Sequence, residues 1–335
     1  MRAPILKVED LSIHFRIDAG EGLFRHDYQT IKAVDRVSFE LGAAETLGIV
    51  GESGCGKSTL ARAILGLVAP AGGRIVWLGE NLIGKSEEEM RAKRRELQLI
   101  FQDPYGSLDP RMTIGQIVGE PLQNFFPSMS RMQVRERVSG MLKMVGLAPE
   151  QINRYPHEFS GGQCQRIGIA RALVVNPRLV VCDEPVSALD VSIQAQIVNL
   201  LRELQKKLQL SLIFIAHDLS VVRHVSNRVL VMYLGRVMEV ADSERIYREP
   251  AHPYTRALIE SVPIPEPRAE RERARRSLGG ELPSPTNPPS GCVFRTRCPF
   301  AQDKCARAEP PLEELEDGTR VACVRHAEIR GELEV

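Results

Sequence analysis

The sequence contains no apolar run long enough to cross a membrane. The longest such stretches, at Leu210–Ala216 and Val229–Leu234, are far shorter than the roughly 20 residues that a transmembrane helix needs. Residues 1–7 also lack the long apolar segment and small-residue cleavage site of a secretory signal. A cytosolic protein is therefore expected.

A strong charge of either sign is missing as well. The chain has 44 Lys and Arg against 43 Asp and Glu, so its formal net charge is +1. This balance is not that of a protein that coats nucleic acid, and no nucleic-acid partner is expected. No internal repeat stands out. The 335 residues, of which 43% are hydrophobic, suffice for a substantial core and more than one structural unit.

Two segments near the start alternate apolar and polar residues. Residues 5–15 and 31–42 show this pattern over short runs, which predicts half-buried antiparallel strands. The polar, Gly-containing residues 16–30 between them are expected to form a loop. This part of the chain should therefore build a small antiparallel sheet.

Apolar runs of buried-strand type alternate with helical segments in the rest of the first 245 residues. The predicted strands are 46–50, 179–182 and 210–216, and the predicted helices include 59–68, 86–97, 167–175 and 192–208. Such alternation is typical of a parallel sheet with helices on its faces. Residues 111–146 are expected to be mostly helical, with breaks at Pro121 and Pro127.

Residues 51–58 read Gly-Glu-Ser-Gly-Cys-Gly-Lys-Ser and match the phosphate-binding loop pattern in full. The loop lies between a predicted buried strand and a predicted helix, whose N-terminus attracts anions. Lys57 would reach the β- and γ-phosphates, and the Ser58 hydroxyl would ligate Mg²⁺. The residues expected to bind ATP here are Gly51, Ser53, Gly54, Cys55, Gly56, Lys57, Ser58 and Thr59.

An acidic pair follows the predicted strand at 179–182. Asp183 could hold the water shell of Mg²⁺, and Glu184 is then placed to polarise an attacking water. An apolar run that ends in Asp-Glu is a weak signal alone, because many strands enter loops in this way. Together with the phosphate-binding loop, it predicts an ATPase.

Residues 159–163, Phe-Ser-Gly-Gly-Gln, resemble the signature motif of ATP-binding cassette (ABC) proteins, which usually begins with Leu. Ser160, Gly161 and Gly162 would open a helix and so offer a second anion site. The resemblance implies that Ser160–Gln163 meet the γ-phosphate held by another ATPase subunit. In isolation, the same residues could be no more than a helix cap.

Three further short motifs resemble the same family. Gln102 in Phe-Gln-Asp-Pro resembles the Q-loop, Asp190 in Ser-Ala-Leu-Asp resembles the D-loop, and His217 resembles the switch histidine. The resemblance implies that Gln102 senses the metal and water, Asp190 touches the opposite subunit, and His217 contacts the γ-phosphate. The expected catalytic residues are Glu184, His217 and Gln102, and the expected Mg²⁺ ligands are Ser58, Gln102 and Asp183.

Members of this family often place an aromatic residue under the adenine ring. Tyr28 lies five residues before Ala33, the position where family members often have this aromatic residue, and Phe15 and Phe24 are competing candidates. Stacking of this kind contributes roughly 1–3 kcal/mol per base and tolerates different bases. Tyr28 is the predicted adenine contact.

The resemblance extends beyond the cassette. Residues 245–258, which include His252-Pro253-Tyr254, resemble the C-terminal extension of dipeptide and oligopeptide importer ATPases, and residues 101–112 resemble the F-type subunit. This implies uptake of di- or oligopeptides by a peripheral subunit at the cytoplasmic face of the inner membrane. The implied partners are a related, non-identical ATPase subunit, two transmembrane permease subunits and an extracytoplasmic solute-binding protein.

Other readings stay open at this point. Some importers of this group carry nickel or glutathione, and an exporter or a non-transport ABC ATPase would share the same motifs. The implied fold is α/β: a P-loop (RecA-like) core with an antiparallel β subdomain and an inserted helical subdomain at about 103–172. The implied domains are the nucleotide-binding domain, 1–245, and a small Cys-rich extension, 246–335, with a charged run at 266–276 and a Pro/Ser linker at 283–290.

Four of the seven cysteines crowd into the last part of the chain. They are Cys292, Cys298, Cys305 and Cys323, with gaps looser than the paired C-x2-C units of zinc ribbons. In a reducing cytosol, such a group is more typical of a metal than of disulfides. Similar sets in the family can hold a [4Fe–4S] cluster, which is the expectation here. Zn²⁺ and a set of buried free thiols are the alternatives.

Overall fold

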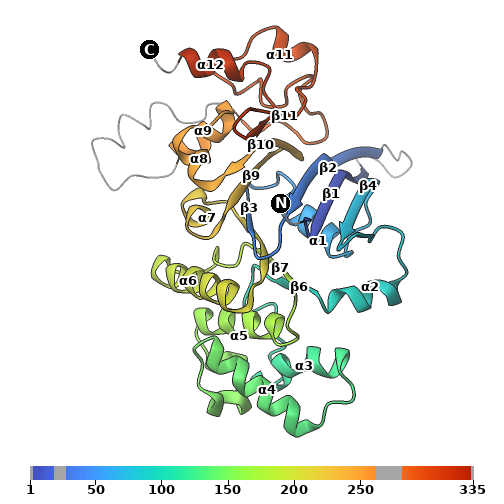
Figure 1. Cartoon of the computed structure of the whole chain (residues 1–335), viewed down its shortest axis with the longest axis vertical. Helices are drawn as coiled ribbons and strands as arrows, with labels where there is room; N and C mark the ends of the chain where they lie inside the picture. Colours follow the sequence, from blue (N-terminus) through green and yellow to red (C-terminus); the bar gives the residue numbers. More distant parts are fainter. Residues whose placement is uncertain (1–2, 19–27, 262–280, 333–335) are drawn as a thin grey trace. The chain divides into compact units, whose positions relative to one another are not determined.

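The computed structural model describes residues 3–18, 28–261 and 281–332 (Figure 1). The charged run at 266–276 and the adenine candidate Phe24 lie outside these residues. The chain divides into two units. Unit 1 comprises Met1–Ile5, Leu41–Thr46 and Gly84–Ala216, and unit 2 comprises Leu6–Glu40, Leu47–Ile83 and His217–Val335.

Unit 1 contains three parallel strands: β6 (Leu97–Ile100), β7 (Leu179–Asp183) and β8 (Ser211–Ala216). The middle strand, β7, pairs with β6 on one side and with β8 on the other. Every residue of β7 and β8 is buried, because a parallel strand covered on both faces has no polar side to expose. The parallel sheet and the two predicted strands are confirmed, whereas the short β6 was not anticipated.

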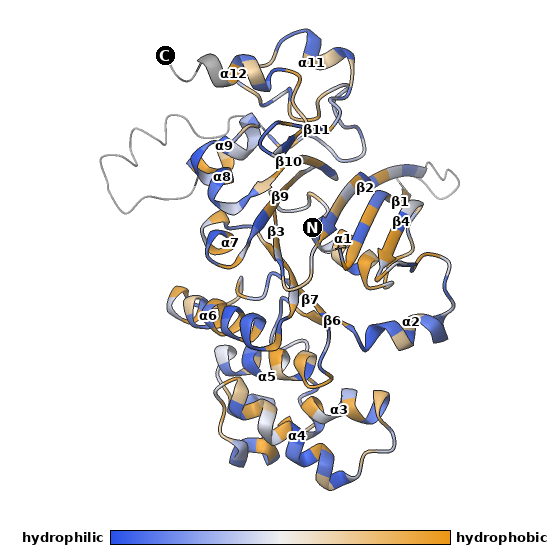
Figure 2. Cartoon of the chain, in the orientation of Figure 1, coloured by the Kyte–Doolittle hydropathy of each residue, from blue (hydrophilic) through white to orange (hydrophobic). Residues whose placement is uncertain are grey.

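The helices of unit 1 are α2 (Glu87–Arg94), α3 (Ile114–Phe125), α4 (Arg131–Met144), α5 (Gly161–Leu173) and α6 (Val191–Leu208), with 3₁₀ turns η1 (Pro149–Asn153) and η2 (Pro156–Glu158). Helices α3, α4 and α5 pack against one another, in green in Figure 1. Along α6, hydrophobic and hydrophilic residues alternate in the manner of a helix with one buried face (Figure 2).

Two predictions for unit 1 were wrong in detail. Pro121 lies inside α3 and does not break it, whereas Pro127 does lie between α3 and α4. The predicted helix 86–97 ends early, because Leu97 already begins β6. Ser86 caps α2 by accepting a hydrogen bond from the Glu89 amide, so the helix begins where its capping box places it.

Unit 2 contains the strand that precedes the phosphate-binding loop. Strand β3 (Thr46–Val50) is buried and pairs in parallel with β9 (Arg228–Tyr233). Strand β9 pairs antiparallel with β10 (Arg236–Asp242). Strand β10 pairs antiparallel with the short β12 (Arg320–Val321), and β12 pairs antiparallel with β11 (Glu313–Glu314). Residues of the C-terminal extension thus complete the edge of this sheet.

A second sheet in unit 2 has the order β2–β1–β4–β5. Strands β1 (Leu6–Asp18) and β4 (Gly72–Trp77) are antiparallel, as are β4 and β5 (Glu80–Asn81), and β2 (Tyr28–Leu41) lies beside β1. The antiparallel β part is confirmed. The predicted loop at 16–30 is too long, because residues 16–18 and 28–30 are strand.

In the described part of unit 2 the helices are α1 (Lys57–Ile64), α7 (Leu219–Val225), α8 (Ser243–Arg248), α9 (Pro253–Glu260), α11 (Lys304–Arg307) and α12 (His326–Glu332). Helix α1 begins at Lys57 and ends at Ile64, shortly before Gly66 adopts a φ of 65°. The prediction of helix at 65–68 was therefore wrong. None of the described helices combines the length and apolar character that a membrane crossing requires.

Candidate nucleotide-binding site

The loop at 51–58 joins β3 to α1 within unit 2. Gly51 and Gly56 have φ values of 153° and 103°, where side chains are disfavoured. A Cβ atom on Gly51 would lie 2.1 Å from the Met232 carbonyl oxygen, and one on Gly56 would lie 2.0 Å from that of Ala33. Both glycines are therefore required by close backbone contacts with neighbouring strands.

The ammonium group of Lys57 contacts the start of the loop. Its Nζ donates to the carbonyl oxygens of Gly51 at 2.8 Å and Glu52 at 3.0 Å, and only 4% of the residue is exposed. Cys55 is buried behind the loop, and burial raises the pKa of its thiol. Ser53 and Gly54 are exposed. The loop thus holds a buried cation beneath an open backbone, as an anion site requires.

Unit 1 places the predicted catalytic glutamate in a strained backbone conformation. Glu184 has a φ of 47°, and its amide donates to the Ile215 carbonyl at 3.1 Å. A left-handed residue other than Gly costs about 1–3 kcal/mol and is common at functional sites. The exposed Gln102 donates from Nε2 to Glu184 Oε2 at 3.0 Å. The structure therefore brings these two predicted residues together, next to the buried Asp183.

Ser160 begins α5 with a reciprocal capping box. The Gln163 amide donates to Ser160 Oγ at 3.4 Å, and the Ser160 amide donates to Gln163 Oε1 at 3.0 Å. A Cβ atom on Gly162 would lie 2.5 Å from Ile193 Cγ2, so this glycine lets α5 approach α6. Ser160 is exposed, and its hydroxyl keeps a proton to donate outward. The cap and an anion site are thus compatible.

The D-loop residues connect directly to Glu184. The Ser187 hydroxyl donates to the Glu184 carbonyl oxygen at 3.1 Å, and the exposed Asp190 takes the N-cap position of α6 without capping it through its side chain. In unit 2, the exposed His217 directly follows β8 in the chain, and Asp218 caps α7 by accepting from the Ser220 amide at 2.7 Å.

Two adenine candidates are on neighbouring strands of unit 2. Tyr28 begins β2 and is 63% exposed, and Phe15 on β1 is 41% exposed. Both present aromatic surface that a base could cover. Their geometry does not decide between them, so Tyr28 stays a prediction.

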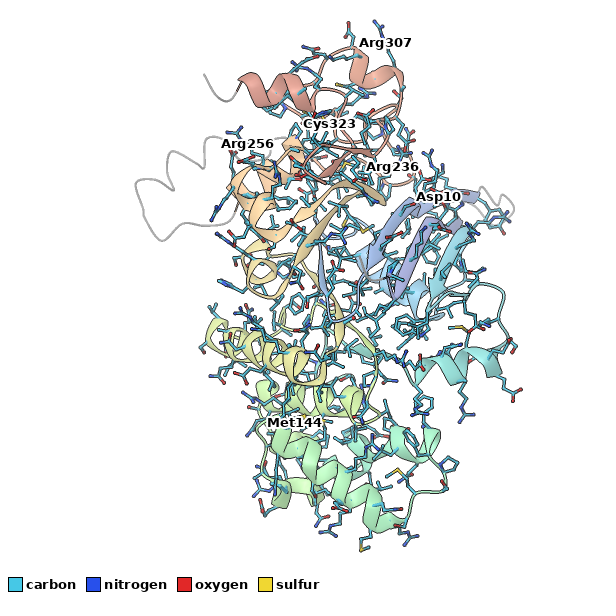
Figure 3. All side chains as sticks on the ribbon, viewed as in Figure 1. Asp10, Met144, Arg236, Arg256, Arg307 and Cys323 are labelled. Atoms are coloured by element: carbon cyan, nitrogen blue, oxygen red, sulfur yellow. The ribbon has the colours of Figure 1, made fainter. Side chains whose placement is uncertain are left out.

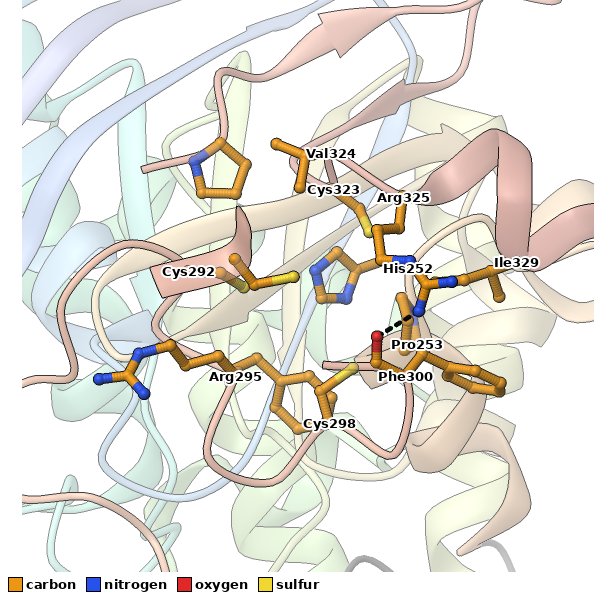
Figure 4. A pocket seen from close by; sticks show the side chains of 13 residues that line it. His252, Pro253, Cys292, Arg295, Cys298, Phe300, Cys323, Val324, Arg325 and Ile329 are labelled. Carbon is orange, nitrogen blue, oxygen red and sulfur yellow. Dashed lines mark hydrogen bonds between the residues drawn. The ribbon is translucent and has the colours of Figure 1, made fainter. Parts of the chain in front are cut away.

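Four cysteines of the extension line one pocket. They are Cys292, Cys298, Cys305 and Cys323, and Figure 4 shows three of them directed into a pocket that His252 also lines. All seven thiols of the chain are free. Burial raises the pKa of Cys298 and of Cys323 to about 11. Within the described residues, no three His, Cys, Asp or Glu side chains are grouped closely enough to hold a single metal ion.

Sequence reasoning missed one feature of the site. Glu52, a variable position of the loop pattern, forms a bidentate ion pair with Arg297 of the extension, with distances of 2.7 and 3.0 Å. Its amide also donates to the Tyr254 hydroxyl at 2.9 Å. In the sequence, the His-Pro-Tyr motif indicates only the family and does not predict a contact between Tyr254 and the loop. No local pattern pairs residues so far apart.

Comparison with known proteins shows the family to which the chain belongs. A family described as ABC transporter matches residues 34–187, and a family described as oligopeptide/dipeptide transporter, C-terminal region, matches residues 238–305. An oligopeptide transport ATP-binding protein, OppF, of Escherichia coli is 60% identical over 93% of both chains. The chain belongs to the ABC transporter ATPase family.

A further relative and two solved ABC structures are also similar to this chain. OppF of Haemophilus influenzae is 57% identical over 96% of this chain and 97% of its own. Among solved structures, the cassette MJ0796 with ADP and Pi, described as a dimer after hydrolysis, has a TM-score of 0.63 and 29% identity over 71% of this chain and 98% of its own. CbiO1 of Clostridium perfringens also reaches 0.63, at 28% identity over 74% and 92%.

Proposed function

We propose that this ABC ATPase energises the uptake of di- and oligopeptides across the cell membrane. The observation that carries the proposal is full-length similarity to oligopeptide transport ATP-binding proteins, which includes the C-terminal region at 238–305. The proposed partners are a related ATPase subunit, two permeases and an extracytoplasmic solute-binding protein. The subunit would then work at the cytoplasmic face of the inner membrane, as a peripheral protein.

The proposed mechanism begins with ATP on the loop at 51–58. Lys57 Nζ donates to two carbonyl oxygens and lies 3.8 Å from Cys55 Sγ. In the proposed complex it would exchange this weak sulfur contact for a hydrogen bond to a phosphate oxygen. Ser58, Asp183 and Gln102 would surround Mg²⁺ with oxygen ligands. Glu184 would accept a proton from the attacking water, and its hydrogen bond from Gln102 fixes the carboxylate.

The terminal phosphate would be bound from the other side by Ser160–Gln163 of the second ATPase subunit. ATP then has a higher affinity for the closed pair than for the open one, and only such a difference lets a ligand shift a conformational equilibrium. Hydrolysis removes the bridging group and releases the pair. Asp190 would contact the partner, His217 the γ-phosphate, and Tyr28 the adenine.

A reconstituted transporter tests the proposed cargo. The chain would be assembled with its permeases and second ATPase subunit in lipid vesicles, and phosphate release would be measured with candidate solutes and a solute-binding protein. Stimulation by tri- to pentapeptides supports the proposal. Stimulation by nickel or glutathione alone contradicts the proposal. ATP-driven transport of solute away from the cytoplasmic side, which is export, also contradicts it. Lys57→Ala is the control, because it should lose nucleotide binding.

We also propose that residues 246–335 form a C-terminal extension that a [4Fe–4S] cluster stabilises. Four thiols line one pocket, and four thiolates are the usual ligand set of such clusters. Four thiolates also suit Zn²⁺, which is the alternative occupant of this pocket. Bound there, the cluster would link segments with little core of their own.

Anaerobic purification tests the cluster. The expected result is a brown protein with visible thiolate–iron absorbance and about four iron atoms per chain, both lost in Cys298→Ser. Cys164→Ser is a matched control, because Cys164 is buried in α5 far along the chain from the extension. A colourless protein with stoichiometric zinc would show that the proposal is wrong.

A further inference from the structure

The second residue of the phosphate-binding loop is held by the C-terminal extension. All polar groups of Glu52 have partners, and two of these lie beyond residue 250. Its amide donates to Tyr254 Oη at 2.9 Å, and its carboxylate accepts from both terminal nitrogens of Arg297 at 2.7 and 3.0 Å. Its carbonyl oxygen accepts from Lys57 Nζ at 3.0 Å and from the Cys55 amide at 3.2 Å.

Arg297 is built into this position. Only 7% of its side chain is exposed, and its guanidinium lies 5.9 Å from the centre of the Tyr233 ring. The hydrogen bonds that Arg297 donates to the Glu52 carboxylate raise the pKa of Arg297. A bidentate pair fixes both distance and angle, which a single surface ion pair does not. If the carboxylate were removed, a largely desolvated cation would lose its partner.

Tyr254 is fixed just as firmly. It is fully buried, and its ring lies 4.7 Å from that of Tyr233 and 5.2 Å from that of Phe294. Its amide donates to His252 Nδ1 at 3.0 Å, and the buried Glu239 carboxylate accepts from the His252 amide at 2.9 Å. The His-Pro-Tyr turn is therefore a rigid support for one hydroxyl, and that hydroxyl meets the loop.

From these contacts we infer that Arg297 and Tyr254 are positioning residues for ATP binding, and that the extension and the nucleotide site are energetically coupled. Glu52 adjoins Gly51, and both carbonyl oxygens hold Lys57. A displacement of Glu52 changes where the Lys57 ammonium and the loop amides point. The extension thereby sets the affinity of the loop for phosphate.

Coupling of this kind is reciprocal. If the ordered extension raises the affinity for ATP, then ATP must stabilise the segment that carries Arg297 by the same factor. All contacts concerned lie within unit 2. The inference rests on the proposed binding of ATP at 51–58.

The first test is the affinity of the full-length chain for a fluorescent ATP analogue. Arg297→Gln and the milder Tyr254→Phe should each raise the Kd by about five- to tenfold, the lower end of couplings between sites. In the assembled transporter, KM for ATP should rise while kcat changes little. In Glu52→Gln/Arg297→Gln, the two effects should be smaller than additive, because both changes break one pair.

Matched controls exist in the same part of the chain. Arg256→Gln removes another Arg–Glu pair of the extension, with a distance of 2.9 Å, and Tyr247→Phe removes the hydroxyl of a half-buried tyrosine that donates to the Leu219 carbonyl oxygen. Neither pair reaches the loop, so both variants should bind ATP as the wild type does. A merely structural role of Arg297 would lower Tm without changing the Kd of the folded protein.

The second test is amide hydrogen exchange at 292–298. ATP should slow this exchange in the wild type and not in Glu52→Gln. The inference would be overturned by an unchanged Kd in both Arg297→Gln and Tyr254→Phe, or by an exchange rate at 292–298 that is the same with and without ATP. Either result would leave the proposed function intact. Unchanged ATP binding in Lys57→Ala would instead contradict the proposed function.

Discussion

At the scale of single residues, Glu184 combines backbone strain with a fixed carboxylate. Its φ of 47° lies in the left-handed region, and Gln102 Nε2 donates to its Oε2 at 3.0 Å. A group that must accept a proton in one direction gains from both features, because less reorganisation is needed in the transition state. The strain is thus consistent with the proposed general base.

Replacement of this carboxylate tests its role. Glu184→Gln should keep ATP binding and lower kcat by about 100- to 10,000-fold, because an amide cannot accept the proton of the attacking water. ATP should then trap the closed pair of ATPase subunits. Phosphate release, binding of labelled ATP and size-exclusion chromatography with ATP measure these effects. Glu203→Gln on the exposed side of α6 is the control, and unchanged turnover in Glu184→Gln would exclude this residue as the base.

At the scale of elements, the N-terminus of α5 has a close match elsewhere in unit 1. Helix α4 begins with the same kind of capping box, in which the Gln133 amide donates to Ser130 Oγ at 3.3 Å and the Ser130 amide donates to Gln133 Oε1 at 2.9 Å. Local geometry alone therefore does not distinguish the helix start that we propose to contact a phosphate from a helix start without such a role.

This pair of helices allows a controlled substitution. Asp caps helices about as well as Ser, so Ser160→Asp and Ser130→Asp should each change the free energy of unfolding by only about 0.5 kcal/mol. Only Ser160→Asp should stop ATP hydrolysis, because its carboxylate would repel the γ-phosphate of the opposite subunit. Thermal unfolding and phosphate release check this. Normal hydrolysis in Ser160→Asp would mean that Ser160 serves only as a cap.

The elements that the sequence predicted well are those with a strong local signal. Strands β7 and β8 are continuous buried runs, and α6 carries a helical period. Strand β6 was missed because a strand of only four residues, directly after a charged helix, is too short to show a recognisable hydrophobic periodicity. Pro121 was misjudged because the residue is buried in α3, which packs against α4 and α5, and this packing is not visible in the sequence. Local propensity is a weak prior where tertiary packing decides.

At the scale of the whole molecule, an ion-pair network connects the antiparallel sheet with the extension. Arg236, labelled in Figure 3, donates to Asp35 at 2.8 and 3.1 Å and pairs with Glu309 at 2.9 Å, and Arg36 also pairs with Glu309. All four residues belong to unit 2. Burial disfavours the Asp35 carboxylate, but the hydrogen bond and charge of Arg236 outweigh this and keep the pKa of Asp35 below its usual value.

The depressed pKa sets the sign of a pH dependence. The stability that Asp35 contributes is present above its unfolded pKa, about 4, and is lost as the pH falls through the lower folded value. Asp35→Asn should therefore cost about 1.5–3 kcal/mol near neutral pH and progressively less in acid. Denaturant unfolding at several pH values measures this, with Glu203→Gln as control. A cost that does not change with pH would contradict the assignment.

The sequence by itself determined the order of the nucleotide motifs. The Ser160 cap and the buried strands follow from neighbouring residues, so short patterns predict them, whereas contacts with Met232 and Ala33 explain why Gly51 and Gly56 must be glycine. The tertiary structure alone decided which distant groups meet. Glu52 and Arg297 are 245 positions apart, and Asp35 and Arg236 are 201 apart. Side chains brought together only by the folded chain leave no periodicity or spacing in the sequence.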